Sequence, residues 1–410
     1  MSFEEILCSL RDIGLSNPEE EMVLITDEPK IPGYLCFLND KATGEYSTGG
    51  VFGQGFDTDK TKARVKALGE CLERLCLYNP DENKFLLSAY RSDSCFTDPA
   101  LFCCYSEEQL PRVEFLKRLR QVHYQYRWWP VLDLTSGQER FMPAQLVFLS
   151  SILDDEIPIR KERISTGAAL GQIGTQHALA SGFMESIERD ACISSYLTKR
   201  SMRRIINLPK DLTDLLECIT RYQLDVNVFD ATTDLEIPTA LVVTLDHTGI
   251  GPAVNVGSRS DTNYYDAIKY AVLESIHCRR NARIMIGQKQ IVPNEEEINS
   301  MDDRFFYWCP LERISDIGFW LKDKVVVSYM DLIEGDTTLK RALETVKSRG
   351  YHILVADITL KPIRDKGFEV LKVVIPELHP LYLDERAKAL YSLHFGDIKE
   401  DKSLKPHPLT

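Results

Sequence analysis

The chain alternates between short runs of apolar residues and longer stretches in which apolar residues recur at helical spacing. The first pattern is typical of buried strands, and the second is typical of helices with one buried face. The short runs predict strands at 22–26, 34–38, 140–149, 225–232, 239–246, 325–330, 352–359 and 369–376. The longer stretches predict helices at about 58–77, 175–197, 210–221, 263–283 and 337–348. Because no low-complexity linker separates these elements, we expect a mixed α/β (α+β) fold with several subdomains.

Three regions are expected along the chain. Residues 1–45 form an N-terminal α/β segment, residues 46–400 form the main domain, and residues 401–410 form an extended tail. The start of the first region, "MSFEEILCSLRDIGL", predicts an amphipathic surface helix and lacks the features of a signal peptide. The tail is assigned because "DIKEDKSLKPHPLT" shows no hydrophobic periodicity.

Charge and cysteine content exclude several classes of protein. The formal net charge of −13 argues against nonspecific nucleic-acid binding, which requires a basic face for the phosphates. No stretch approaches the roughly 20 apolar residues that a membrane-spanning helix needs. The eleven cysteines are scattered and form no CxxC pair. We therefore expect reduced thiols in a cytoplasmic protein without a zinc site.

One acidic motif recurs along the chain. The segment "KALGECLERLCL" (66–77) contains two glutamates three residues apart, and "GFMESIERDACI" (182–193) repeats the arrangement. A weaker third copy, "YAVLESIHCRR" (270–280), has His277 in the second acidic position. The glutamates of the three copies are Glu70, Glu73, Glu185, Glu188 and Glu274.

Residues three apart share one face of a helix, so each pair points in one direction. In a partly buried site, two such carboxyls raise each other's pKa, and a hard cation such as Mg²⁺ relieves the conflict. The arginines that follow, Arg74 and Arg189, can bind phosphate oxygens in a forked geometry. The alternative is ordinary surface charge, but apolar neighbours such as Leu72 and Ile187 indicate that the helices are largely buried.

A glycine-rich segment precedes each of the first two motifs, at 47–59 and 165–175. Glycines let a backbone approach a phosphate or another backbone closely. The alternative is a flexible turn before a helix cap, at Asp57 or Asp59 and at Thr175. With no P-loop, HExxH or GxSxG motif present, these features together favour an unusual site for nucleotide phosphates and Mg²⁺.

Several stretches, in this order, resemble the YcaO-domain family. They are "GQGFDTDKTKARVKALGECLERL", "STGAALGQ", "ALASGFMESIERDA", "FDATTDLEIPTALVV" and "VADITLKPIRDKGFEVLKVVIPELHPLY". The resemblance implies a YcaO-like fold with acidic helices around a central nucleotide site. It also implies ATP-dependent activation of a peptide backbone amide, giving an azoline ring with a neighbouring Cys, Ser or Thr, or a thioamide with external sulfide.

The resemblance also implies roles for individual residues. Mg²⁺ would be held by Glu70, Glu73, Glu185, Glu188 and Glu274. ATP would be bound by Lys66, Arg74, Gln172, Arg189, Lys269 and Arg279. Many azoline-forming members end in a PxPxP segment that reaches the active site, which implies catalytic roles for Pro406, Pro408 and Thr410.

Some positions depart from the family pattern. These are Lys66, Gln176 or His177, Tyr270, His277 and Glu377. They support the alternative that the chain is a degenerate YcaO protein that has lost ATP chemistry and serves as a binding or scaffold subunit. In the leading interpretation, the resemblance implies a peptide or protein substrate, a homodimer, and a separate E1-like leader-binding or TfuA-type partner.

Overall fold

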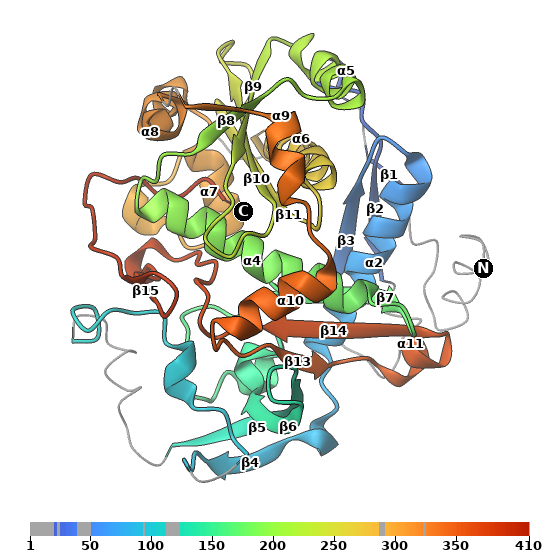
Figure 1. Cartoon of the computed structure of the whole chain (residues 1–410), viewed down its shortest axis with the longest axis vertical. Helices are drawn as coiled ribbons and strands as arrows, with labels where there is room; N and C mark the ends of the chain where they lie inside the picture. Colours follow the sequence, from blue (N-terminus) through green and yellow to red (C-terminus); the bar gives the residue numbers. More distant parts are fainter. Residues whose placement is uncertain are drawn as a thin grey trace.

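The computed structural model describes residues 20–22, 25–38, 51–92, 95–111, 124–286, 292–322 and 325–409 (Figure 1). Three parts of the sequence-based expectations lie outside these residues. They are the N-terminal helix, the start of the first glycine-rich segment and Thr410.

Four β-sheets form the framework. A three-stranded antiparallel sheet comprises β1 (Glu20–Glu21), β2 (Gly33–Phe37) and β3 (Phe52–Phe56). A five-stranded sheet has the order β11 (Val254–Ser260), β10 (Thr239–Asp246), β9 (Leu224–Asp230), β8 (Arg203–Ile206) and β12 (Val326–Ser328). A six-stranded sheet has the order β4 (Leu86–Ala89), β5 (Gln125–Asp133), β13 (Leu354–Asp357), β14 (Phe368–Val374) and β7 (Ala168–Gln172), with β6 (Gln138–Pro143) paired to β5. A small hairpin joins β15 (Tyr391–Ser392) to β16 (Gly396–Asp397).

The helices cover these sheets, and α4 lies at the centre of the molecule (Figure 1). It packs against β7 and β14 of the six-stranded sheet and also against β11 of the five-stranded sheet. The α-helices are α2 (Lys60–Tyr78), α4 (His177–Leu197), α5 (Lys210–Thr220), α6 (Tyr264–Ile286), α7 (Met301–Tyr307), α8 (Gly318–Leu321), α9 (Tyr329–Leu332), α10 (Leu339–Ser348) and α11 (Lys361–Asp365). Within the described residues, no helix is long and apolar enough to cross a membrane.

The five helices expected from the sequence are confirmed. α2 starts after Asp59, whose carboxylate accepts the backbone N–H of Lys62 at 3.0 Å. The cap expected at Asp59 is therefore confirmed. The residue directly before α4 is Gln176, whose side chain caps nothing, but Thr175 Oγ1 accepts the backbone N–H of His177 at 3.4 Å, so the cap expected at Thr175 is present one residue further out.

The strand expected at 140–149 is wrong beyond Pro143. There the chain forms a 3-10 turn at Ala144–Leu146. The buried Gln145 amide explains the change, because its Nε2 donates to the carbonyl oxygen of Ile157 and its Oε1 accepts the N–H of Ile159. These bonds fix the side chain inside the domain, where it holds the turn against the segment at Ile157 and Ile159.

The two glycine-rich segments are not simple loops, because they contain the strands β3 and β7. Their glycines bring strand backbone against helix backbone. A Cβ atom on Gly53 would lie 2.2 Å from the carbonyl oxygen of Ala67 in α2. A Cβ atom on Gly257 in β11 would lie at the same distance from the carbonyl oxygen of Ala271 in α6. Only glycine permits either approach.

Replacing Gly257 with alanine should therefore destabilise the protein. The new methyl group meets backbone atoms that cannot rotate away, so we expect a loss of about 3 kcal/mol in the free energy of unfolding, measured by chemical denaturation. Gly69→Ala is the matched control, because a Cβ atom there meets only Leu170 Cδ2, at 3.9 Å. Alanine in that helix should stabilise by about 0.5–1 kcal/mol. Equal effects of the two substitutions would contradict the packing argument.

Candidate functional site

Three glutamates each accept a hydrogen bond from the strand segment that precedes their own helix. The backbone N–H of Gln54 donates to Glu70 at 2.5 Å, that of Gly167 to Glu185 at 2.9 Å, and that of Ser258 to Glu274 at 2.6 Å. The glycines at the strands make these short contacts possible. The sequence repeat is therefore also a structural repeat of strand, helix and tethered carboxylate.

The second glutamates of the first two motifs complete the cluster. Glu188 is buried in α4 and accepts hydrogen bonds from Ser258 Oγ at 2.7 Å and from the N–H of Ser260 at 3.4 Å. These bonds join α4 to β11. Glu73 of α2 lies close enough to Glu185 for each charge to act on the other. The structure thus brings together the five carboxylates expected from the sequence.

Four carboxyl groups of this cluster do not ionise easily. Burial raises the pKa of Glu70, Glu73, Glu188 and Glu274. Repulsion adds to this effect, because Glu185 raises the pKa of Glu73 and Glu188 raises that of Glu274. The cluster therefore carries more negative charge than its surroundings neutralise, which is the condition that a bound cation relieves.

Two of the expected cations contact the carboxylates directly. Arg74 Nη2 lies 2.6 Å from Glu70 Oε1, and its Nη1 donates to the carbonyl oxygen of Phe52. Arg189 lies 3.5 Å from Glu185 and 3.9 Å from Glu188. Burial alone would lower the pKa of Arg189, but the neighbouring glutamates raise it, so this guanidinium stays charged.

Three further cations gather around the ring of Tyr270. Lys66 Nζ lies 4.2 Å from the ring centroid and 2.8 Å from Asp57 Oδ2. Lys269 Nζ lies 5.7 Å from the same centroid, and the Arg259 guanidinium carbon lies 5.8 Å from it. Arg259 also lowers the pKa of Glu188 and Glu274. A basic group that binds phosphates well thus adjoins the acidic cluster.

Sequence reasoning missed two cations, Arg259 and Lys372. Arg259 follows the glycine of β11, so the strand–helix repeat could have identified it. Lys372 in β14 is buried, and its Nζ donates to the carbonyl oxygen of Ile164 at 2.5 Å. Burial lowers its pKa to about 8, although Glu185 and Glu73 act in the opposite direction. No local pattern marks this lysine, because its position depends on pairing between β14 and β7.

The structure does not bring Arg279 or Gln172 to the cluster. Arg279 is buried in ion pairs with Glu28 and Asp246, each at 2.8 Å. It lies five residues after Glu274 on α6, which turns it to another side of the helix. Gln172 is exposed at the end of β7. Their expected role in ATP binding therefore stays a prediction that the arrangement of the cluster does not support.

His277 stands in the third motif where Glu73 and Glu188 stand in the first two, so this position provides no carboxylate. Its Nε2 lies 2.6 Å from Gln54 Oε1, and its ring stacks on Phe56. Burial, with the nearby positive charges, lowers its pKa to about 4, so the ring is neutral. His277 therefore fixes Gln54, the residue whose N–H binds Glu70.

The described part of the C-terminal tail is packed into the protein and lies beside α4 (Figure 1). Pro406, His407 and Pro408 are buried. Tyr196 Oη donates to the carbonyl oxygen of Lys405 at 3.0 Å, and Arg304 Nη1 donates to that of His407 at 2.9 Å. Tyr196 lies seven residues after Arg189, on the same face of α4. A disordered tail is therefore excluded for the described part, and the tail lies along the helix face that carries Arg189.

The donor set fits Mg²⁺. Among the described residues, no three His, Cys, Asp or Glu side chains are grouped closely enough to hold a metal ion as they stand. However, Mg²⁺ commonly binds one or two carboxylates together with waters and phosphate oxygens, and carboxylate oxygen is the ligand it prefers. Glu70, Glu73, Glu185, Glu188 and Glu274 provide such oxygens from three helices.

Comparisons with known proteins agree with this geometry. The family model described as YcaO cyclodehydratase, ATP- and Mg²⁺-binding, matches residues 53–379. This chain therefore belongs to the YcaO family, and ATP and Mg²⁺ are its cofactors. The comparison with curated proteins gives no match.

Similar solved structures share the fold. A heterocyclase in complex with substrate and cofactor has a TM-score of 0.68 and 18% identity over 92% of this chain, which spans 52% of that chain. This chain thus spans about half the length of that relative. YcaO from Methanopyrus kandleri, bound with AMPPCP and Mg²⁺, has a TM-score of 0.64 and 17% identity, covering 92% of this chain and 91% of that one. The E. coli microcin synthetase McbBCD complex with pro-MccB17 bound has a TM-score of 0.64 and 16% identity, with 88% of each chain covered.

Glu73→Gln should stabilise the protein in the absence of Mg²⁺. An acid whose pKa is higher in the folded state than in the unfolded state opposes folding above its unfolded pKa, so the neutral amide removes this cost. We expect a gain of about 1 kcal/mol or more at pH 7.5 in denaturant titrations. The gain should vanish below about pH 4, where the carboxyl is protonated in both states.

The same variant should lose most of the stabilisation that Mg²⁺ with ATP gives to the wild type, because a ligand is missing. The exposed Glu217→Gln, which also removes one negative charge, should change neither quantity. A Glu73→Gln protein that is less stable than the wild type without Mg²⁺ would contradict the repulsion argument.

Proposed function

We propose that this chain uses Mg²⁺ and ATP to activate a backbone amide of a peptide or protein for azoline formation. The observation that carries the proposal is the grouping of five carboxylates from three helices, four of them with a raised pKa, beside a basic group of Lys66, Arg259 and Lys269. Bound ATP supplies the phosphoryl group, and bound Mg²⁺ neutralises its charge. The carboxylates hold the metal, while these cations and Arg189 hold phosphate oxygens.

Such a site suits phosphoryl transfer, which depends mainly on positioning and on stabilisation of charge. The hydrogen bonds from Gln54, Gly167 and Ser258 fix one carboxylate on each helix before ligands bind. Arg189, held by Glu185 and Glu188, is similarly oriented. Little reorganisation is then needed when the phosphates arrive, which is how an enzyme lowers an electrostatic barrier.

We also propose that the tail takes part in the reaction. Pro406 and Pro408 are buried near the α4 face that carries Arg189, and Leu409 and Thr410 follow them in sequence. We expect this tail to help position the reacting groups of the substrate beside Arg189.

The substrate is proposed to reach this site with a separate partner protein, such as an E1-like leader-binding or TfuA-type protein. The similar McbBCD structure is an assembly with a bound pro-peptide, which supports a partner in general. Thioamide formation with sulfide is an alternative product at the same site. Mass spectrometry separates the two outcomes, since an azoline loses one water whereas a thioamide exchanges oxygen for sulfur. We propose a homodimer, which size-exclusion chromatography with light scattering would test.

The decisive experiment is calorimetric titration with ATP, with and without Mg²⁺, of the wild type and Glu188→Gln. We expect Mg²⁺-dependent binding by the wild type, weakened by about ten-fold or more in the variant, because one charged ligand is lost. Glu217→Gln should bind as the wild type does.

Absence of nucleotide binding by a folded wild-type protein would overturn the proposal. It would favour the degenerate scaffold alternative, provided that the partner protein does not restore binding.

A further inference from the structure

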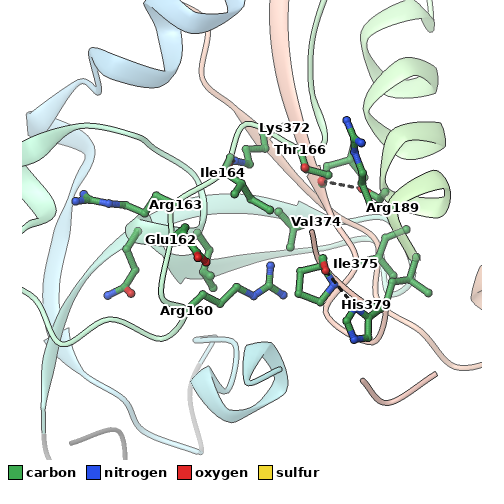
Figure 2. Close-up of a pocket in the computed structure, with 16 residues that line it drawn as sticks. Arg160, Glu162, Arg163, Ile164, Thr166, Arg189, Lys372, Val374, Ile375 and His379 are labelled. Carbon is green, nitrogen blue, oxygen red and sulfur yellow. Dashed lines mark hydrogen bonds between the residues drawn. The ribbon is translucent and has the colours of Figure 1, made fainter. Parts of the chain in front are cut away.

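A pocket bordered by Arg189 lies between the loop at 160–166, the end of β14 and α4 (Figure 2). Its polar lining includes Arg160, Thr166, Arg189 and Lys372. In Figure 2, Lys372 lies next to Ile164, and Arg189 lies beside Thr166. Arg189 thus belongs both to this pocket and to the acidic cluster.

The lining is markedly basic. Lys372 is only 2% exposed, and its hydrogen bond goes to the carbonyl oxygen of Ile164, which carries no charge. Arg160 uses Nε to bind the carbonyl oxygen of Phe102, and its guanidinium extends toward Ile375 and His379 in Figure 2. Glu185 and Glu73 act on this ammonium ion from the acidic cluster, but burial still lowers its pKa, so an anion bound in the pocket would stabilise its charged form.

The other charged residues at the pocket are directed elsewhere. The Glu162 carboxylate accepts the backbone N–H groups of Leu383 and Asp384. The Arg163 guanidinium points away from the pocket in Figure 2 and pairs with Asp154. The cavity between them therefore presents positive charge from Arg160, Arg189 and Lys372.

We propose that this pocket binds the inorganic phosphate that the reaction produces. The inference rests on the proposed function, in which the terminal phosphoryl group of ATP is transferred to the amide oxygen. That step forms a P–O bond to the amide and breaks the P–O bond to ADP. The thiol or hydroxyl of the neighbouring Cys, Ser or Thr has by then added to the amide carbon and lost its proton, so the C–S or C–O bond of the ring is already formed. The bond between that carbon and the phosphorylated oxygen then breaks, phosphate leaves with the bonding electrons, and the former amide N–H proton is lost as the C=N bond forms. The leaving phosphate then meets Arg189 and Lys372.

A phosphate group at this pocket has two possible sources, the released product and the terminal phosphoryl group of the nucleotide. Inorganic phosphate should be titrated calorimetrically into the full chain saturated with Mg²⁺ and ADP, and the affinities for ADP and AMPPCP should be measured separately. We expect Lys372→Met to weaken phosphate binding by about ten-fold or more and to leave both nucleotide affinities unchanged. Arg160→Gln should weaken phosphate binding as well, and it keeps the test valid if Lys372→Met does not fold.

Lys361→Met is the matched control, since it removes the same charge from an exposed lysine of α11 and should change nothing. No phosphate binding by the wild type, or equal binding by the wild type and both pocket variants, would overturn the inference. A weaker affinity of Lys372→Met for AMPPCP, with unchanged affinity for ADP, would assign the pocket to the nucleotide and also overturn it. If the wild type binds phosphate through Lys372 but binds no nucleotide, the proposed function fails while the pocket stands.

Discussion

The close contact between a glycine-containing strand and the following helix is the constraint on which the site depends. At Gly53 and Gly257 the strand backbone packs directly against the helix. A side chain at either position would overlap the carbonyl oxygen of Ala67 or Ala271. The helix is thereby brought close enough for a backbone N–H of the strand to reach a glutamate one turn further along. The strand backbone that packs against the helix therefore also orients the carboxylates. A change that disturbs this packing is expected to disturb the site as well.

This arrangement places function and stability in opposition. Burying several carboxylates near one another costs free energy, because each charge is desolvated and repels the next. The protein offsets part of the cost with backbone N–H donors, with Ser258 at Glu188, and with Arg74 and Arg189. The negative charge that these groups do not neutralise attracts a divalent cation. The same repulsion between carboxylates therefore destabilises the ligand-free protein and strengthens metal binding.

The sequence predicted the parts of the site that depend on local spacing. Helical periodicity identified α2, α4 and α6, and the three-residue spacing placed each carboxylate pair on one helix face. It could not predict the ion pairs of Arg279, because their partners, Glu28 and Asp246, come from distant segments. It also missed β3, β7 and β11, since glycine in a short apolar run indicates a turn as readily as a strand. Lys372 was missed because only strand pairing brings it to the cluster.

Arg189 connects the separate parts of the mechanism. It pairs with carboxylates on one side, borders the pocket of Lys372 on another, and shares its helix face with Tyr196, which holds the tail. In the proposed reaction, a phosphate that moves from nucleotide to substrate and then to solvent would stay beside this one guanidinium. Because α4 is fixed between the two larger sheets, Arg189 need not move as the negative charge passes it. A rigid central helix is therefore the element best suited to carry the cation common to all three stages.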